Sequence, residues 1–197
     1  FYVDKTSFIE QWWESSDSVT LITRPRRFGK TLNLSMMECF FSPVYYGRTE
    51  LFEGLKIWES EKYRNLQGTY PVIFLSLAGV KNDNYEGAVR SIRFEVSDLC
   101  RRIKHNLNLE KLSRDDRNII ESMSADISED EILTAIKLLS GILSRYYGKK
   151  VILLLDEYDT PMIEAYFSGY WDKMYKFMRM FFNNALKLSL IHISEPT

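Results

Sequence analysis

A chain of 197 residues that is 45% apolar and 27% charged has the composition of an ordinary globular domain with one substantial core. Its formal net charge of -1 creates no overall electrostatic field that would attract the protein to nucleic acid or to a membrane surface. The two cysteines and two histidines lack metal-ligand spacing, so we expect no zinc site and reduced thiols in a cytoplasmic protein. Because we find neither a secretory signal nor an apolar run of about 18 residues, we expect no transmembrane helix.

The first predicted elements are a short helix, a strand and a second helix. Residues 1–17 carry an apolar stripe, and Ser7 and Glu10 have capping-box spacing, which predicts a helix before the first strand. Residues 19–23 form an apolar run typical of a strand. Residues 30–41 have the pattern of the helix that follows it.

The loop between this strand and helix reads Arg24-Pro25-Arg26-Arg27-Phe28-Gly29-Lys30-Thr31. A strand, a loop ending in Gly-Lys-Thr and a helix form the context of a phosphate-binding loop. Gly29 would let the backbone approach a phosphate, Lys30 would contact the outer phosphates, and the Thr31 hydroxyl would be a magnesium ligand. The predicted nucleotide-binding residues are Arg26, Arg27, Phe28, Gly29, Lys30, Thr31 and Leu32. The general pattern has glycine where this chain has Arg24, so the loop alone leaves a basic turn as the alternative.

The middle of the chain predicts a second strand and two long helices. Residues 70–77 form the strand, and Ser76 near its end either faces the same site or is a plain strand-end serine. Residues 85–107 have a helical apolar stripe. Ser128 has capping-box spacing to a glutamate, and the helix that it starts should end at Gly148. The intervening residues 44–69 should pack on the core through Phe52, Leu55, Ile57 and Trp58.

A second, acidic half of the site follows far downstream. Residues 151–155 are an unbroken apolar run, typical of a strand buried on both faces, and Asp156 and Glu157 come directly after it. Asp156 would hold the magnesium ion, and Glu157 could deprotonate a water aimed at the terminal phosphate. The alternative is a buried strand followed by acidic loop residues. Two further helices are predicted, one with Thr160 as its N-terminal cap and Pro161 as its first residue, and one over residues 171–187.

Several stretches resemble the AAA-ATPase-like family of P-loop proteins, which often carry a C-terminal PD-(D/E)XK nuclease-like domain. The resemblance covers residues 1 to about 187, and its matching segments are Phe1-Tyr2-Val3-Asp4-Lys5-Thr6, residues 21–31, residues 70–75 and Leu155-Asp156-Glu157-Tyr158-Asp159. It implies ATP and Mg²⁺ as ligands and accounts for Arg24, which the family shares. It also implies that Tyr2 or Asp4 could lie near the adenine base, with packing against the sheet edge as the alternative.

The expected fold is α/β, a P-loop NTPase with a doubly wound parallel sheet flanked by helices and truncated at its C-terminus. Residues 1–187 would form an incomplete ATPase domain. Residues 188–197 do not resemble the family; they resemble translated sequencing-adapter read-through and would be a non-native tail. A glutamate directly after Asp156 resembles the ATPases that insert a strand between the loop strand and the acidic strand. Residues 188–194 are apolar enough, and their hydrophobicity alternates enough, for them to form that inserted strand.

The leading functional hypothesis is a Mg²⁺-dependent ATPase in which Glu157 and Lys30 are catalytic and Thr31 and Asp156 bind the metal. Truncation could leave the fragment inactive, and Arg26 or Arg27 could act on the phosphates instead of a lost arginine finger. A nucleotide-gated module that controls an attached nuclease-like domain with little turnover is the alternative. A small-molecule kinase would need a substrate pocket that the sequence does not reveal. The charge balance does not support nucleic-acid binding, and an oligomer stays open.

Overall fold

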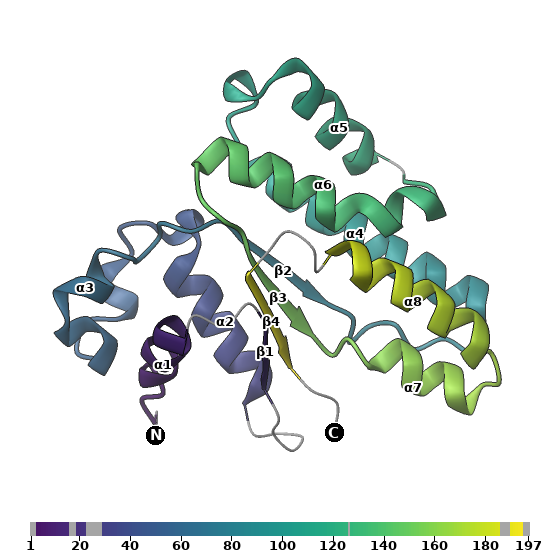
Figure 1. Cartoon of the computed structure of the whole chain (residues 1–197), viewed down its shortest axis with the longest axis horizontal. Coiled ribbons are helices and arrows are strands. Elements are labelled where there is room, and N and C mark those ends of the chain that lie inside the picture. Colours follow the sequence, from purple (N-terminus) through teal and green to yellow (C-terminus); the bar gives the residue numbers. More distant parts are fainter. Residues whose placement is uncertain (1–2, 16–18, 23–28, 126, 186–189, 195–197) are drawn as a thin grey trace.

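The structure is a computed structural model that describes residues 3–15, 19–22, 29–125, 127–185 and 190–194. Its centre is a sheet of four parallel strands in the order β1-β4-β3-β2 (Figure 1). The strands are β1 (Val19–Ile22), β2 (Val72–Ser76), β3 (Ile152–Asp156) and β4 (Leu190–Ser194). Because all four run in the same direction, their carboxyl ends meet at one edge of the sheet, where ligands bind in open α/β folds.

The predicted strands are present, with small differences at their ends. The strand predicted over residues 19–23 is β1, and the one predicted over 151–155 is β3, displaced by one residue toward Asp156. β2 is shorter than predicted because only Val72–Ser76 pair with β3. β4 lies between β1 and β3, the position expected for an inserted strand.

Helices cover both faces of the sheet (Figure 1). On one face lie α1 (Ser7–Ser15) and α2 (Lys30–Phe41), packed on Ile152 and Leu154 of β3. On the other face, a second cluster contains Leu153 and Leu155 and is covered by helices. These are α4 (Tyr85–Asn106), α5 (Arg114–Ala125), α6 (Glu129–Tyr147), α7 (Thr160–Phe167) and α8 (Trp171–Ala185). Every residue of β3 is therefore buried, as its unbroken apolar run predicts.

The predicted caps at both ends of α6 are present, whereas those predicted at the starts of α1 and α7 are displaced by one residue. Ser128 and Glu131 form a reciprocal capping box at the start of α6, which ends at Gly148 with φ of 65°. The prediction for α1 is wrong in detail, because Ser7 is already the first helical residue rather than the cap. Asp159 likewise precedes α7, one residue before the predicted cap at Thr160. None of the described helices combines the length and the hydrophobicity needed to cross a bilayer.

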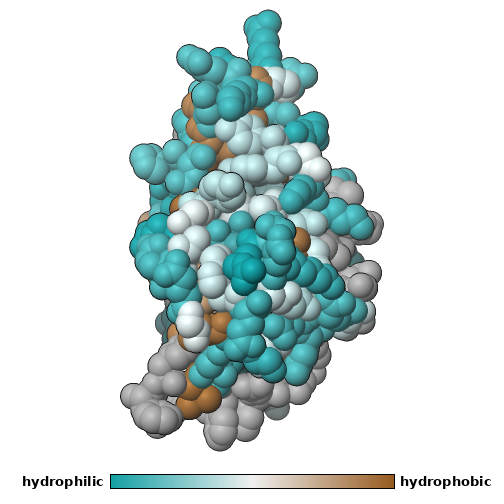
Figure 2. Space-filling model, turned by 90° about the vertical axis from the view of Figure 1, so that its left-hand side faces the viewer, coloured by the Kyte–Doolittle hydropathy of each residue, from teal (hydrophilic) through white to brown (hydrophobic). Residues whose placement is uncertain are grey.

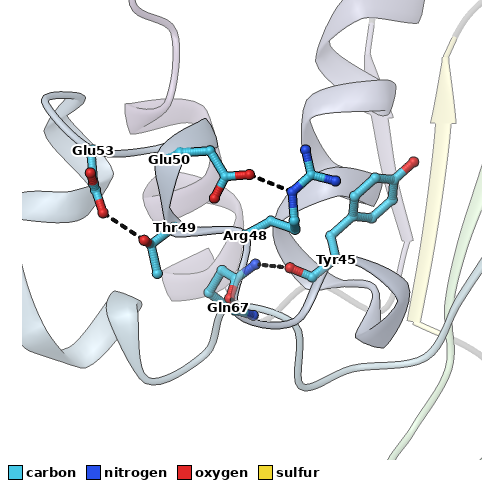
Figure 3. Close-up of polar contacts among 7 residues, drawn as sticks. Tyr45, Arg48, Thr49, Glu50, Glu53 and Gln67 are labelled. Carbon is cyan, nitrogen blue, oxygen red and sulfur yellow. Dashed lines mark hydrogen bonds and ion pairs between the residues drawn. The ribbon is translucent and has the colours of Figure 1, made fainter.

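The segment between α2 and β2 consists of short turns, η1 (Pro43–Tyr45), η2 (Thr49–Leu51) and η3 (Lys56–Glu59), followed by α3 (Glu61–Arg64). Local polar contacts hold it: Gln67 Nε2 donates to the Tyr45 carbonyl at 2.6 Å, and Arg48 pairs with Glu50 (Figure 3). Phe52 and Ile57 are buried, as predicted. Figure 2 shows this side of the molecule, where the described surface is mainly hydrophilic and apolar residues form only small patches. The segment therefore contributes buried side chains to the core, and its described surface on this side is mainly hydrophilic.

Candidate functional site

The two halves of the predicted site meet through one hydrogen bond. Thr31 lies in the first turn of α2, and Asp156 is the last residue of β3. The Thr31 hydroxyl donates to Asp156 Oδ2 at 2.9 Å, although the two residues are 125 positions apart in the sequence. Asp156 is only 2% exposed, and a buried carboxylate requires such partners. The packing of α2 on β3 thus places a hydroxyl and a carboxylate side by side, the pair predicted to bind magnesium.

The N-terminus of α2 has the geometry of an anion site. Gly29 precedes the helix in the left-handed conformation, with φ of 75° and ψ of 30°, which glycine adopts without steric cost. The first N–H groups of a helix have no intrahelical acceptor, and they carry the positive end of its dipole. Lys30 follows directly and is 8% exposed, whereas the Leu32 side chain is 57% exposed. Any contact of Leu32 with a phosphate would therefore come from its backbone.

Glu157 adopts a strained backbone conformation beside Asp156. Its φ is 50°, and among the described residues no other non-glycine residue has a positive φ. The carbonyl of Glu157 accepts from Thr160 N at 3.1 Å, and its carboxylate oxygen Oε2 accepts from Thr160 Oγ1 at 3.3 Å. Strain of this kind is retained where the surrounding structure fixes it, and it concentrates at functional sites. The turn between β3 and α7 therefore holds this carboxylate in a defined place.

A pocket of about 500 Å³ lies at the carboxyl ends of β2 and β3. Its lining residues come from α2, from the end of β2 and the loop after it, and from the β3–α7 turn with the start of α7. They are Thr31, Ser76, Ala78, Lys81, Asp156, Glu157, Thr160, Ile163 and Glu164. Ser76 lines the pocket, which agrees with the interpretation that it faces the same site as Thr31 and Asp156. A more open pocket of about 850 Å³, between the start of α4 and the α7–α8 turn, contains none of these residues.

The oxygen donors present at this site suit magnesium. Mg²⁺ is typically bound by one or two carboxylates together with substrate phosphates and water, and the Thr31 hydroxyl and Asp156 carboxylate are oxygen donors of that kind. In the part of the chain that the structure describes, no group of three or more His, Cys, Asp or Glu side chains could hold a metal. Thr31 and Asp156 would therefore supply only part of a magnesium coordination shell, which water and phosphate oxygens would complete.

Other predicted contacts have different outcomes. Arg26, Arg27 and Phe28 lie outside the described residues, and so does Tyr2. The Asp4 carboxylate accepts hydrogen bonds from Thr6 and from the backbone N–H of Lys56. Burial by itself would raise the pKa of Asp4, but these hydrogen bonds outweigh it and lower that pKa. Asp4 thus fixes the N-terminal segment, which favours packing over contact with the base.

Comparison with known proteins gives the class to which this fold and site belong. The family model described as "Predicted AAA-ATPase" matches residues 1–194, so the chain belongs to the AAA-ATPase-like family. An uncharacterized protein in the vnfD 5' region of Azotobacter chroococcum mcd 1 is 27% identical over 164 residues. The aligned part is 83% of this chain and 26% of the relative, so the chain spans about a quarter of that protein. No solved structure matches the chain.

Family membership supports nucleotide binding as the general property of this site. The expected division into residues 1–187 and a non-native tail stays a prediction.

Proposed function

We propose that the protein is a Mg²⁺-dependent ATPase built on a P-loop NTPase fold with a doubly wound sheet. The observation that carries this proposal is the 2.9 Å hydrogen bond between Thr31 and Asp156, with Glu157 at the next position. A helix N-terminus, a lysine, a hydroxyl and two carboxylates then converge on a nucleoside triphosphate.

Each of these residues has a defined task. The N-terminus of α2 and Lys30 bind the phosphates, and Thr31 and Asp156 hold the metal. Magnesium, when bound, neutralises charge on the phosphate oxygens. Glu157 accepts the proton of the attacking water: Thr160 engages its Oε2, which leaves Oε1 for that proton. The backbone conformation of Glu157 directs its side chain, and the 3.3 Å hydrogen bond to Thr160 adds a weak orienting contact.

The test compares binding and turnover in separate variants. Lys30→Ala should lose Mg-ATP binding in a calorimetric titration, because it removes the ammonium from the phosphate site. Glu157→Gln should bind Mg-ATP normally and hydrolyse it far more slowly, since an amide cannot accept the proton. Lys111→Ala, which changes an exposed lysine in η4 (Leu109–Lys111), is the matched control. Normal hydrolysis by Lys30→Ala would refute the proposal.

A second candidate is a nucleotide-gated module that binds ATP and controls an attached domain with little turnover. It is favoured by the length of the Azotobacter relative, of which this chain matches about a quarter. The attached domain would be nuclease-like, as the family resemblance implies. Intact Mg-ATP binding together with equal, very slow turnover in the wild type and in Glu157→Gln would support this candidate over the ATPase.

A further inference from the structure

The segment before α1 is clamped at two points to the turn η3. Asp4 Oδ2 accepts a hydrogen bond from Lys56 N at 2.8 Å, and Thr6 Oγ1 accepts one from Ile57 N at 3.1 Å. The Thr6 hydroxyl also donates to Asp4 Oδ1 at 2.7 Å, and Thr6 is fully buried. Both neighbours of Lys5 are therefore fixed by long-range contacts, and the backbone of Lys5 has little freedom.

The side chain of Lys5 extends from this clamp to the N-terminus of α2. Its Nζ lies 3.5 Å from the position that a β-carbon on residue 29 would occupy. Gly29 is the residue that precedes α2 and lets the backbone approach a ligand. Lys5 is partly exposed, and no carboxylate of a described residue lies within ion-pair distance of its ammonium. The structure thus places a second ammonium beside the phosphate-binding position.

Lys5 brings an ammonium to the positive end of α2, where the Asp156 carboxylate also lies through its hydrogen bond with Thr31. The N-terminus of a helix carries a partial positive charge, so acidic groups are favourable there and cations are not. The first turn of α2 contains no acidic residue, and Lys30 adds a further positive charge. A ligand with several negative charges supplies acceptors for the Lys5 ammonium and is favoured by the positive charge at this end of α2. The position of Lys5 and its clamp consequently indicate a polyanion as the ligand.

We propose that Lys5 is a binding residue that donates a charge-assisted hydrogen bond to the phosphate chain of the bound nucleotide. This inference rests on the proposed function and adds to it a contact from outside the phosphate loop. Asp4 and Thr6 are positioning residues that hold Lys5 in place through the backbone of η3. The motif Asp4-Lys5-Thr6 thereby combines two residues that anchor the segment with one that reaches the ligand.

The experiment measures Mg-ATP affinity by calorimetry for Lys5→Met, Lys5→Arg and the matched control Lys111→Met. Lys111 is an exposed lysine in η4 and takes no part in the clamp. Loss of one charge-assisted hydrogen bond should weaken Mg-ATP binding by roughly 10- to 100-fold in Lys5→Met. Lys5→Arg should recover part of that affinity, and Lys111→Met should bind like the wild type.

Thermal unfolding separates ligand binding from a structural role of Lys5. Without nucleotide, Lys5→Met should melt at or above the wild-type temperature, since it removes a cation from the positive end of α2. If Lys5→Met binds Mg-ATP as tightly as the wild type while Lys30→Ala does not bind it, Lys5 is not a ligand contact. If Lys5→Met melts well below the wild type without nucleotide, its role is structural. Failure of the wild type to bind Mg-ATP would instead refute the proposed function.

Discussion

Replacing Glu157 with glycine should separate stability from catalysis at one position. Glu157 has φ of 50°, a conformation that costs an L-residue roughly 1–2 kcal/mol and costs glycine nothing. Glycine gives back about 0.5–1 kcal/mol through its larger freedom in the unfolded chain. The hydrogen bond that Glu157→Gly loses is long, at 3.3 Å, and Glu157 is only partly buried, so its contribution is small.

The net expectation for Glu157→Gly is a gain of about 0.5–1 kcal/mol in the free energy of unfolding, combined with loss of ATP turnover. For a domain of this size, such a gain raises the melting temperature by roughly 1–4 °C. Urea unfolding gives the free energy, and a phosphate-release assay gives the turnover. Both are measured on the wild type, Glu157→Gly and Glu157→Gln.

Glu157→Gln is the matched control, because it keeps the left-handed backbone and an oxygen acceptor for Thr160 but removes the proton-accepting carboxylate. It should lose turnover without gaining stability. A Glu157→Gly protein that is less stable than the wild type would show that φ at this position stores no strain. Wild-type turnover in either variant would show that Glu157 is not the base.

Three further predictions concern stability. Ser128→Ala should lower the free energy of unfolding by about 1 kcal/mol, because it breaks the capping box of α6, whereas Ser122→Ala on the exposed face of α5 should be nearly neutral in the same urea titration. Gly68→Ala should destabilise more than Gly54→Ala: both glycines have positive φ, but a β-carbon at Gly68 would lie 2.5 Å from a backbone atom, whereas Gly54 faces open space. Equal melting temperatures for these two variants would contradict this steric argument. The Arg145 guanidinium holds the pKa of Asp116 below its usual value, so their ion pair contributes fully above about pH 3.9 and is lost as the pH falls through the lower folded-state pKa. Arg145→Gln should therefore cost about 0.5–1 kcal/mol at neutral pH, because this arginine is largely exposed, and the difference from the wild type should disappear in strong acid. A difference that persists there would mean that Arg145 acts by packing.

The sequence could predict the elements whose signals lie in consecutive residues. The apolar run before Asp156 identified β3, because a strand buried on both faces has no polar alternation. The capping box at Ser128 and the glycine at position 148 marked both ends of α6, because these signals depend on one turn of backbone. Ser7 and Thr160 were wrongly assigned as caps, because each is the first residue of its helix. A cap assigned by spacing alone can be displaced by one residue.

The residue types available for the site are evident in the chain before it folds: a Gly-Lys-Thr helix start and an Asp-Glu pair after a buried strand. The hydrogen bond between Thr31 and Asp156 could not be foreseen in this way, because it depends on how α2 packs on β3. The positive φ of Glu157 and the position of the Lys5 ammonium are likewise known only from the folded structure. Lys5 reaches Gly29 because its neighbours bond to a turn some fifty residues away, and spacing along the chain does not encode such long-range contacts.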